Sequence, residues 1–248
     1  MRGYRALVEA LLKSNLREPV GFFFLIIFSP ALLVVLGLIF GNEPSPEFGM
    51  QGFVDQMLPG MTVIAIMIVA IMVVPQQQLT LRETGALTRL RITPLEPRTF
   101  VAADLTVYFG LGLLGALLTL IVGLAAFGVS WPAMVLGVVG ALVLGHLAML
   151  AIGYTLAAIY PSVAAATGIG NGLMILLMLT SGTMIPTATI PDGVQALMRF
   201  SPVYHVVELV RASWSGEAWP WVSVVVLVGI LVVFAALATW LFRWDRAK

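Results

Sequence analysis

The stretch that decides the fold runs from Trp219 to Phe242 and reads WPWVSVVVLVGILVVFAALATWLF. It contains no Asp, Glu, Lys or Arg, and tryptophan lies near both of its ends. A helix needs about 20 apolar residues to cross the hydrocarbon core of a bilayer. Tryptophan is enriched where such a helix meets the membrane surface. This stretch therefore predicts a transmembrane helix.

Five other stretches share this length and this lack of charged residues, and they lie at 20–40, 59–79, 105–128, 133–160 and 163–185. The chain of 248 residues is 60% hydrophobic and 10% charged, with a mean hydropathy of +1.03. A soluble fold is excluded, because soluble domains average about 45–50% apolar and about 25% charged residues. The sequence predicts an all-α integral membrane protein with six transmembrane helices, which form one domain over residues 20–248.

The lysines and arginines orient these helices. Of the 13 basic residues, all but Arg199 and Arg211 lie in the N-terminal tail, the loop between the second and third spans, or the C-terminal tail. Basic loops stay in the cytoplasm. We therefore expect both termini to be cytoplasmic.

Residues 1–19 predict an amphipathic helix that lies along the inner membrane surface. Apolar residues from Tyr4 to Leu16 recur at helical spacing, and Arg5 and Lys13 fall on the opposite face. Pro19 ends this helix before the first span begins. A plain basic anchor that only sets the orientation of the chain is the alternative interpretation.

Groups that carry catalysis are missing from the sequence. The chain has no cysteine and no P-loop, zinc-protease or serine-hydrolase motif. We therefore expect no enzyme activity, no metal and no cofactor in this chain, and the net charge of +1 gives no reason to expect nucleic acid. No carboxylate falls inside the six predicted spans, which argues against proton coupling. We expect His146, in the fourth span, to make a packed, hydrogen-bonded helix contact.

Methionine and weakly polar residues in the second and fifth spans are candidates for the lining of a substrate path. Methionine side chains adapt to varied apolar ligands, and the candidates are Met67, Met72, Asn171, Met174, Met178 and Thr180. Ordinary helix packing or lipid contact is the alternative role. Small residues four apart, at 137, 141 and 145 and at 164, 168 and 172, allow close helix approach within the chain or across a dimer.

The loop between the second and third spans, Arg82–Arg98, reads RETGALTRLRITPLEPR. Its first half predicts a short basic helix that Pro94 and Pro97 bring to an end. A short helix held beneath the membrane by two spans is suited to docking a partner. A basic loop that only sets the orientation is the alternative interpretation.

This loop resembles the RE-x-G-x-L-x-x-L-x-x-TP-L stretch of ABC transporter permeases of the type-2 exporter class. Three more stretches match that class in order, at Arg17–Pro19, at Pro30 with Phe40–Gly41, and from Ser181 to Gly216. The resemblance covers nearly the whole chain and is closest to the drug- and antibiotic-export branch. It implies a half-permease of a bacterial inner membrane that pairs with a second permease copy. It also implies separate P-loop ATPase chains that bind ATP and Mg²⁺.

The resemblance further implies a role for each segment. Residues 82–92 would be the coupling helix that docks on the ATPase, through Arg82, Glu83, Leu87, Leu90, Arg91 and Pro94. The turn Tyr160–Ser162 would be a second ATPase contact, and residues 4–17 the interfacial connecting helix. Residues 186–213 would be short re-entrant helices that close the exit on the outer side.

The implied function is ATP-driven export of a hydrophobic or amphipathic small molecule, such as a drug, an antibiotic or a lipid. Export of a lipid-linked polysaccharide is the alternative within the class. A membrane scaffold without a transport role is the alternative outside it.

Overall fold

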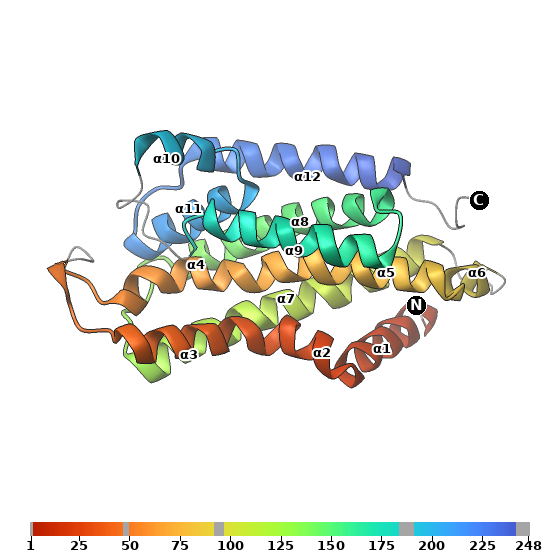
Figure 1. The fold of residues 1–248 in the computed structure, drawn as a ribbon, viewed down its shortest axis with the longest axis horizontal. Helices are drawn as coiled ribbons and strands as arrows, with labels where there is room; N and C mark the ends of the chain where they lie inside the picture. Colours follow the sequence, from red (N-terminus) through yellow and green to blue (C-terminus); the bar gives the residue numbers. More distant parts are fainter. Residues whose placement is uncertain (1, 47–49, 92–96, 184–190, 242–248) are drawn as a thin grey trace.

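The computed structural model describes residues 2–46, 50–91, 97–183 and 191–241, and every regular element within these ranges is helical. Figure 1 shows an elongated bundle whose long helices run along its long axis. The first half contains α1 (Arg2–Arg17), α2 (Pro19–Phe22), the π-helical turn η1 (Phe23–Ile27), α3 (Phe28–Phe40), α4 (Phe53–Ile68), the π-helical turn η3 (Val69–Val73), α5 (Val74–Glu83) and α6 (Ala86–Arg91). The second half contains α7 (Pro97–Phe127), α8 (Val135–Ile159), α9 (Val163–Leu179), α10 (Asp192–Met198), α11 (Pro202–Ser215) and α12 (Trp221–Leu241).

The centre of the bundle is one continuous helix, Phe53–Glu83, made of α4, η3 and α5. In its most apolar window 89% of the residues are buried inside the protein, against 11% for α12. Helices α3, α7, α8, α9 and α11 pack around it. A helix enclosed on all sides has no polar face, which explains why α4 is almost entirely apolar after its first turn.

Five helices are long and apolar enough to cross a membrane, namely Pro19–Phe40, Phe53–Glu83, Arg98–Phe127, Val135–Ile159 and Trp221–Leu241. The chain is therefore built as a multi-pass membrane protein. The predicted fifth span, 163–185, corresponds to α9, which has 17 residues and ends at Leu179. At about 1.5 Å per residue it is slightly shorter than the hydrocarbon core of about 30 Å. Residues 184 and 185 lie outside the described part of the chain.

Two helices begin earlier than the predicted spans to which they correspond. The helix of the second predicted span, 59–79, begins at Phe53, and the helix of the third, 105–128, begins at Pro97. The prediction placed Asp55 and Asp104 in loops because they are charged, whereas hydrogen bonds to their carboxylates let both lie within helices. Asp55 accepts from the side chain of Asn42 at 3.0 Å and from the backbone N–H of Ser130 at 3.2 Å.

Pro30 in the first span and Pro75 in the second each follow a π-helical turn. Pro30 lies three residues after the end of η1, and Pro75 lies two residues after the end of η3. Proline lacks an N–H group and crowds the carbonyl four residues earlier, and in both helices that carbonyl belongs to the π-helical turn. The wider turn therefore accommodates the proline without ending the helix.

The two ends of the bundle carry different elements. Figure 1 shows α1, α6 and the end of α12 at one end, and α10 and α11 toward the opposite end. The predicted N-terminal helix is present as α1, which packs against α7 and joins it through a hydrogen bond of 2.8 Å between Tyr4 Oη and Thr106 Oγ1. We refer below to the α6 end and the α11 end.

The two stripes of small residues have different surroundings. In α8, a side chain at Gly137 would meet Ser213 and one at Gly145 would meet Val206, so this stripe allows α11 to pack closely. In α9, the positions of Gly168 and Gly172 face open space. The first stripe therefore allows close packing within the chain, whereas a side chain at Gly168 or Gly172 of the second stripe would meet no described helix of the same chain.

Candidate functional site

The predicted docking segment begins with two charged residues that bind the neighbouring turn of the same chain. Arg82 Nη1 donates to the backbone carbonyl of Ala157 at 2.8 Å, near the C-terminus of α8. Glu83 Oε1 accepts from the backbone N–H of Val163 at 3.0 Å, at the first residue of α9. A cation at a helix C-terminus and an anion at a helix N-terminus both complement the helix dipole. We call this pair of contacts the Arg82–Glu83 clamp.

The clamp corrects the predicted extent of the coupling helix. Arg82 and Glu83 belong to the last turn of α5, and α6 begins only at Ala86. The chain changes direction at Gly85, which has a positive φ of 68° and donates its N–H to the carbonyl of Arg82. Such a backbone conformation favours glycine. The clamp thus fixes the end of α5, and α6 extends from a defined break.

Within α6 the predicted docking residues have different surroundings. Leu87 is 0% exposed, so it packs within the chain and offers no surface for docking in this conformation. Arg89 is exposed and donates to the carbonyl of Thr84 at 3.2 Å. The side chains of Leu90 and Arg91, and all of Pro94, lie outside the described residues.

The turn Tyr160–Ser162, the predicted second contact, is built to start a helix. Ser162 is the N-cap of α9, and its Oγ accepts from the backbone N–H of Ala165 at 3.2 Å. Pro161 is exposed. Because Glu83 also binds the first residue of α9, the clamp connects this turn to the base of α6, and the two predicted docking elements form one surface at the α6 end.

Neither of the two cavities described below is lined by any of the predicted substrate-path residues. Met67 is fully buried in the core of the bundle, and Met72, Met174, Met178 and Thr180 are partly buried. Asn171 is exposed on α9. The exposed face of α9 also carries Gly168 and Gly172, and we call these three residues with Ala164 the α9 face.

At the α11 end lies a polar cavity of about 680 Å³ between the loops and α11. Its wall includes Gln56, Glu208 and Arg211, and Arg211 donates to the carbonyl of Gly182 at 2.7 Å. Burial raises the pKa of Glu208 and lowers the pKa of Arg211, and the opposite charges of the two residues partly offset these effects. Many residues of α11 are buried, as the sequence led us to expect for this apolar segment.

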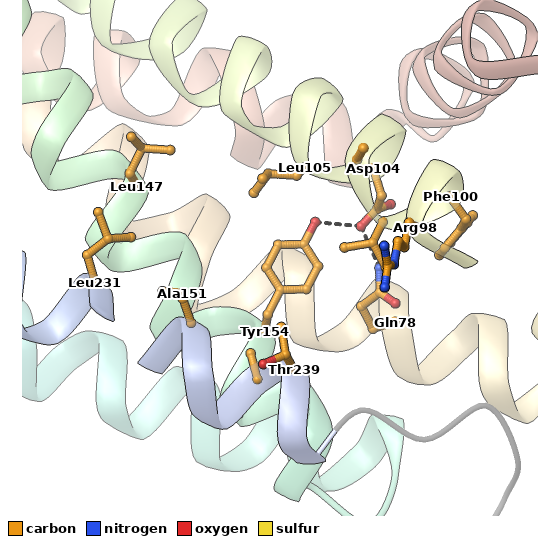
Figure 2. Close-up of a pocket in the computed structure, with 14 residues that line it drawn as sticks. Gln78, Arg98, Phe100, Asp104, Leu105, Leu147, Ala151, Tyr154, Leu231 and Thr239 are labelled. Carbon is orange, nitrogen blue, oxygen red and sulfur yellow. Dashed lines mark hydrogen bonds between the residues drawn. The ribbon is translucent and has the colours of Figure 1, made fainter. Parts of the chain in front are cut away.

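The sequence analysis missed a buried carboxylate, Asp104 of α7, which is 0% exposed. Figure 2 shows it between α5 and α8, where Gln78 Nε2 and Tyr154 Oη both donate to its Oδ2 at 2.6 Å. A signal for it was present in the sequence. Proline is favoured in the first turn of a helix, so Pro97 could have marked the start of α7, and the apolar run from Phe100 continues on both sides of Asp104.

His146 makes the packed contact that the sequence predicted. Its Nε2 lies 3.1 Å from the carbonyl oxygen of Tyr108, and its ring stacks on Phe109 with the centroids 5.3 Å apart. The missing side chain of Gly112 leaves the space that this ring fills. His146 thus joins α8 to α7.

The described part of the chain is a polytopic helical bundle, with the short helix α6 at one end and the short helices α10 and α11 toward the other. The sequence model of the ABC-2 type transporter family matches residues 2–215, and the chain therefore belongs to that family. This confirms the resemblance to type-2 permeases and makes the chain the membrane component of an ABC transporter. No curated protein matches the chain in a sequence search.

Proposed function

We propose that this chain is the permease subunit of an ATP-driven exporter of hydrophobic or amphipathic small molecules. Two copies form the membrane unit, and separate P-loop ATPase chains bind ATP and Mg²⁺ and dock at the α6 end. The chain itself needs no cofactor. Family membership supports the transporter role, and the resemblance to the drug- and antibiotic-export branch supports the direction and the substrate class.

The Arg82–Glu83 clamp is the observation that carries this proposal. It ties the α8–α9 turn to the end of the helix that forms the centre of the bundle, and α6 begins at Ala86, directly after the turn at Thr84 and Gly85. A force applied to α6 therefore reaches the buried centre without passing through a flexible linker. Rigid-body movement of packed helices is a common way in which a local event changes a distant site.

The proposed topology has six crossings, with α9 as the shortest and with both termini in the cytoplasm of a bacterial inner membrane. The excess of Lys and Arg at the α6 end supports this orientation. Helices α10 and α11 then dip into the outer leaflet, and the polar cavity beside Glu208 and Arg211 opens at the exit side. Helix α1 lies along the inner surface, where its basic face meets lipid headgroups.

The α9 face is the surface on which the second permease copy packs. Asn171 is a polar amide on an otherwise apolar membrane helix, and the space above Gly168 and Gly172 is open. Small residues allow close approach of helices, and side-chain amides form hydrogen bonds across such contacts. The substrate path then lies between the copies, where Asn171 and its neighbours on α9 contribute to the lining.

Introduced cysteines test the docking surface cleanly, because the chain has none of its own. Arg89→Cys places a photo-cross-linker on the exposed face of α6, and Glu217→Cys, which is exposed after α11, is the matched control. We expect a P-loop ATPase to be captured from native membranes through position 89 and not through position 217. ATP-dependent accumulation of a fluorescent amphiphile in inverted vesicles tests transport itself.

The same experiments separate the alternatives. A stable oligomer that captures no ATPase at position 89 refutes the proposal in favour of a membrane scaffold. Capture of the ATPase without movement of amphiphiles, together with movement of a lipid-linked glycan, favours polysaccharide export.

A further inference from the structure

A second cavity lies inside the bundle, close to the α6 end, between α5, α7, α8 and α12 (Figure 2). Its volume of about 510 Å³ falls within the range of about 300–1,000 Å³ that is usual for small-molecule sites. The cavity lies within one chain. It is formed neither by α6 nor by the α9 face, so its role is independent of the ATPase partner and of the second copy.

The carboxylate of Asp104 belongs to the wall of this cavity. Both of its hydrogen bonds, from Gln78 and from Tyr154, end on Oδ2. Its other oxygen, Oδ1, is buried and has no hydrogen-bond partner, and the same holds for Oε1 of Gln78. A buried acceptor without a partner is destabilising, and more so when it belongs to a charged group. A ligand that donates hydrogen bonds to both of these acceptors would remove this destabilisation.

The missing donor is best matched by a cation. Tyr154 and Gln78, which both donate to Oδ2 of Asp104, are neutral side chains, so neither balances a negative charge on the carboxylate. A positively charged donor at Oδ1 would balance it. A buried carboxylate is normally paired with a positive charge. A protonated amine would supply both the charge and the N–H donors.

The remaining wall of the cavity is apolar. Its surface comes mainly from Leu105 of α7, Leu147 and Ala151 of α8, and Leu231 and Ala235 of α12. Ala102 and Thr239, which also line it, are exposed on the outside of the bundle. A ligand can therefore reach the cavity sideways from the surrounding lipid, with an apolar body against α8 and α12.

We propose that this cavity is a binding site for an amphiphile whose protonated amine donates to Asp104 Oδ1 and Gln78 Oε1 while its apolar body lies against α8 and α12. The amine comes either from a free cationic amphiphile or from an amino headgroup of a membrane lipid. Arg98, which lines the mouth of the cavity and is exposed, repels such a cation and weakens its binding.

The test measures protection of a single cysteine inside the cavity. Ala235→Cys is introduced into the otherwise cysteine-free chain, and Val232→Cys, 63% exposed at its native residue and on the same helix, is the control outside the cavity. The purified protein is placed in phosphatidylcholine nanodiscs, because the quaternary ammonium of that lipid has no N–H donor. The rate of maleimide labelling is then followed while dodecylammonium is added.

We expect dodecylammonium to slow labelling at position 235 and not at position 232. Asp104→Asn should raise the amine concentration needed by about 10- to 100-fold, the range for a lost hydrogen bond to a charged group. Arg98→Gln should lower it. Dodecanol has the same alkyl chain and no charge. In protein that keeps Asp104, it should protect position 235 at least about tenfold less well than dodecylammonium does.

Two results would overturn the proposal. One is equal protection by dodecanol and dodecylammonium, and the other is unchanged protection in Asp104→Asn protein that labels normally at position 232. Nanodiscs that contain phosphatidylethanolamine distinguish the sources. Protection by this lipid alone identifies a lipid amine, and protection only by added dodecylammonium identifies a free amphiphile.

Discussion

Substitution of Glu83 tests whether the clamp holds the α8–α9 turn against the central helix. Glu83→Gln keeps an acceptor oxygen near the N–H of Val163 but removes the negative charge from the N-terminus of α9. Glu83→Ala removes both the charge and the hydrogen bond of 3.0 Å. The two variants therefore separate the electrostatic part of the contact from the hydrogen bond.

The expected size of the effect follows from these two contributions. A carboxylate at a helix N-terminus contributes about 0.3–1 kcal/mol, and a hydrogen bond contributes about 0.5–1.5 kcal/mol. The glutamine variant should therefore lose less than about 1 kcal/mol of local stability, and the alanine variant about 1–2.5 kcal/mol. Because about 1.4 kcal/mol corresponds to tenfold, amides in the first turn of α9 should exchange about five- to fiftyfold faster in Glu83→Ala.

Hydrogen–deuterium exchange with mass spectrometry of the peptide that contains Val163 measures this directly. Glu9→Gln is the matched control, because Glu9 lies 4.0 Å from Lys13 in an exposed ion pair of α1 that contributes little to stability. ATPase stimulation in the assembled transporter is measured alongside. It should be lower in Glu83→Gln than in the parent protein, and lower still in Glu83→Ala. Exchange at α9 that matches the parent in both Glu83 variants would refute the clamp as a structural connection.

Three further predictions concern close contacts, the α9 face and the half-buried Glu208 beside the polar cavity. Gly153→Ala should destabilise the protein by about 1–3 kcal/mol in thermal unfolding, because a methyl group there meets the backbone of η3. Its control is Gly229→Ala, which should be neutral or slightly stabilising because Gly229 faces open space. Gly168→Cys and Gly172→Cys should form disulfide-linked dimers under mild oxidation in membranes and Gly229→Cys should not; monomers in all three would exclude α9 as the contact between copies. Burial raises the pKa of Glu208, so the folded protein holds this carboxyl proton more tightly than the unfolded chain does. The free energy of unfolding should therefore fall as the pH rises from the unfolded-state pKa of Glu208 through its higher folded-state pKa. Glu208→Gln should flatten this pH dependence in unfolding measured from pH 4 to 8.

The long apolar stretches were predictable because a lipid-spanning helix must satisfy its own backbone. The ends of the helices were not predictable in the same way. Asp55 and Asp104 lie inside helices because partners distant in sequence, such as Ser130 and Tyr154, donate to their carboxylates. A rule that removes charged residues from spans cannot recognise partners of this kind, and it shortened both helices.

The candidate site was predictable in its location but not in the task of each residue. The motif that begins at Arg82 marked the α6 end, yet its first two residues bind within the chain rather than being free for a partner. Leu87 has the same ambiguity, since an apolar residue on a short basic helix suits an ATPase groove and a contact within the chain equally well. Small residues at four-residue spacing were equally ambiguous until α11 was found against one stripe and open space against the other.

The burial of the Phe53–Glu83 helix has a consequence for how the chain is made. Of the helices that pack around it, α3 is synthesised before this helix, whereas α7, α8, α9 and α11 are all synthesised later. Until α7 is inserted, Gln78 lacks Asp104, the group to which it donates in the finished protein. The core of this permease therefore enters the bilayer before its surroundings, and biogenesis must hold a helix with no lipid-facing side until the last helices of the chain close around it.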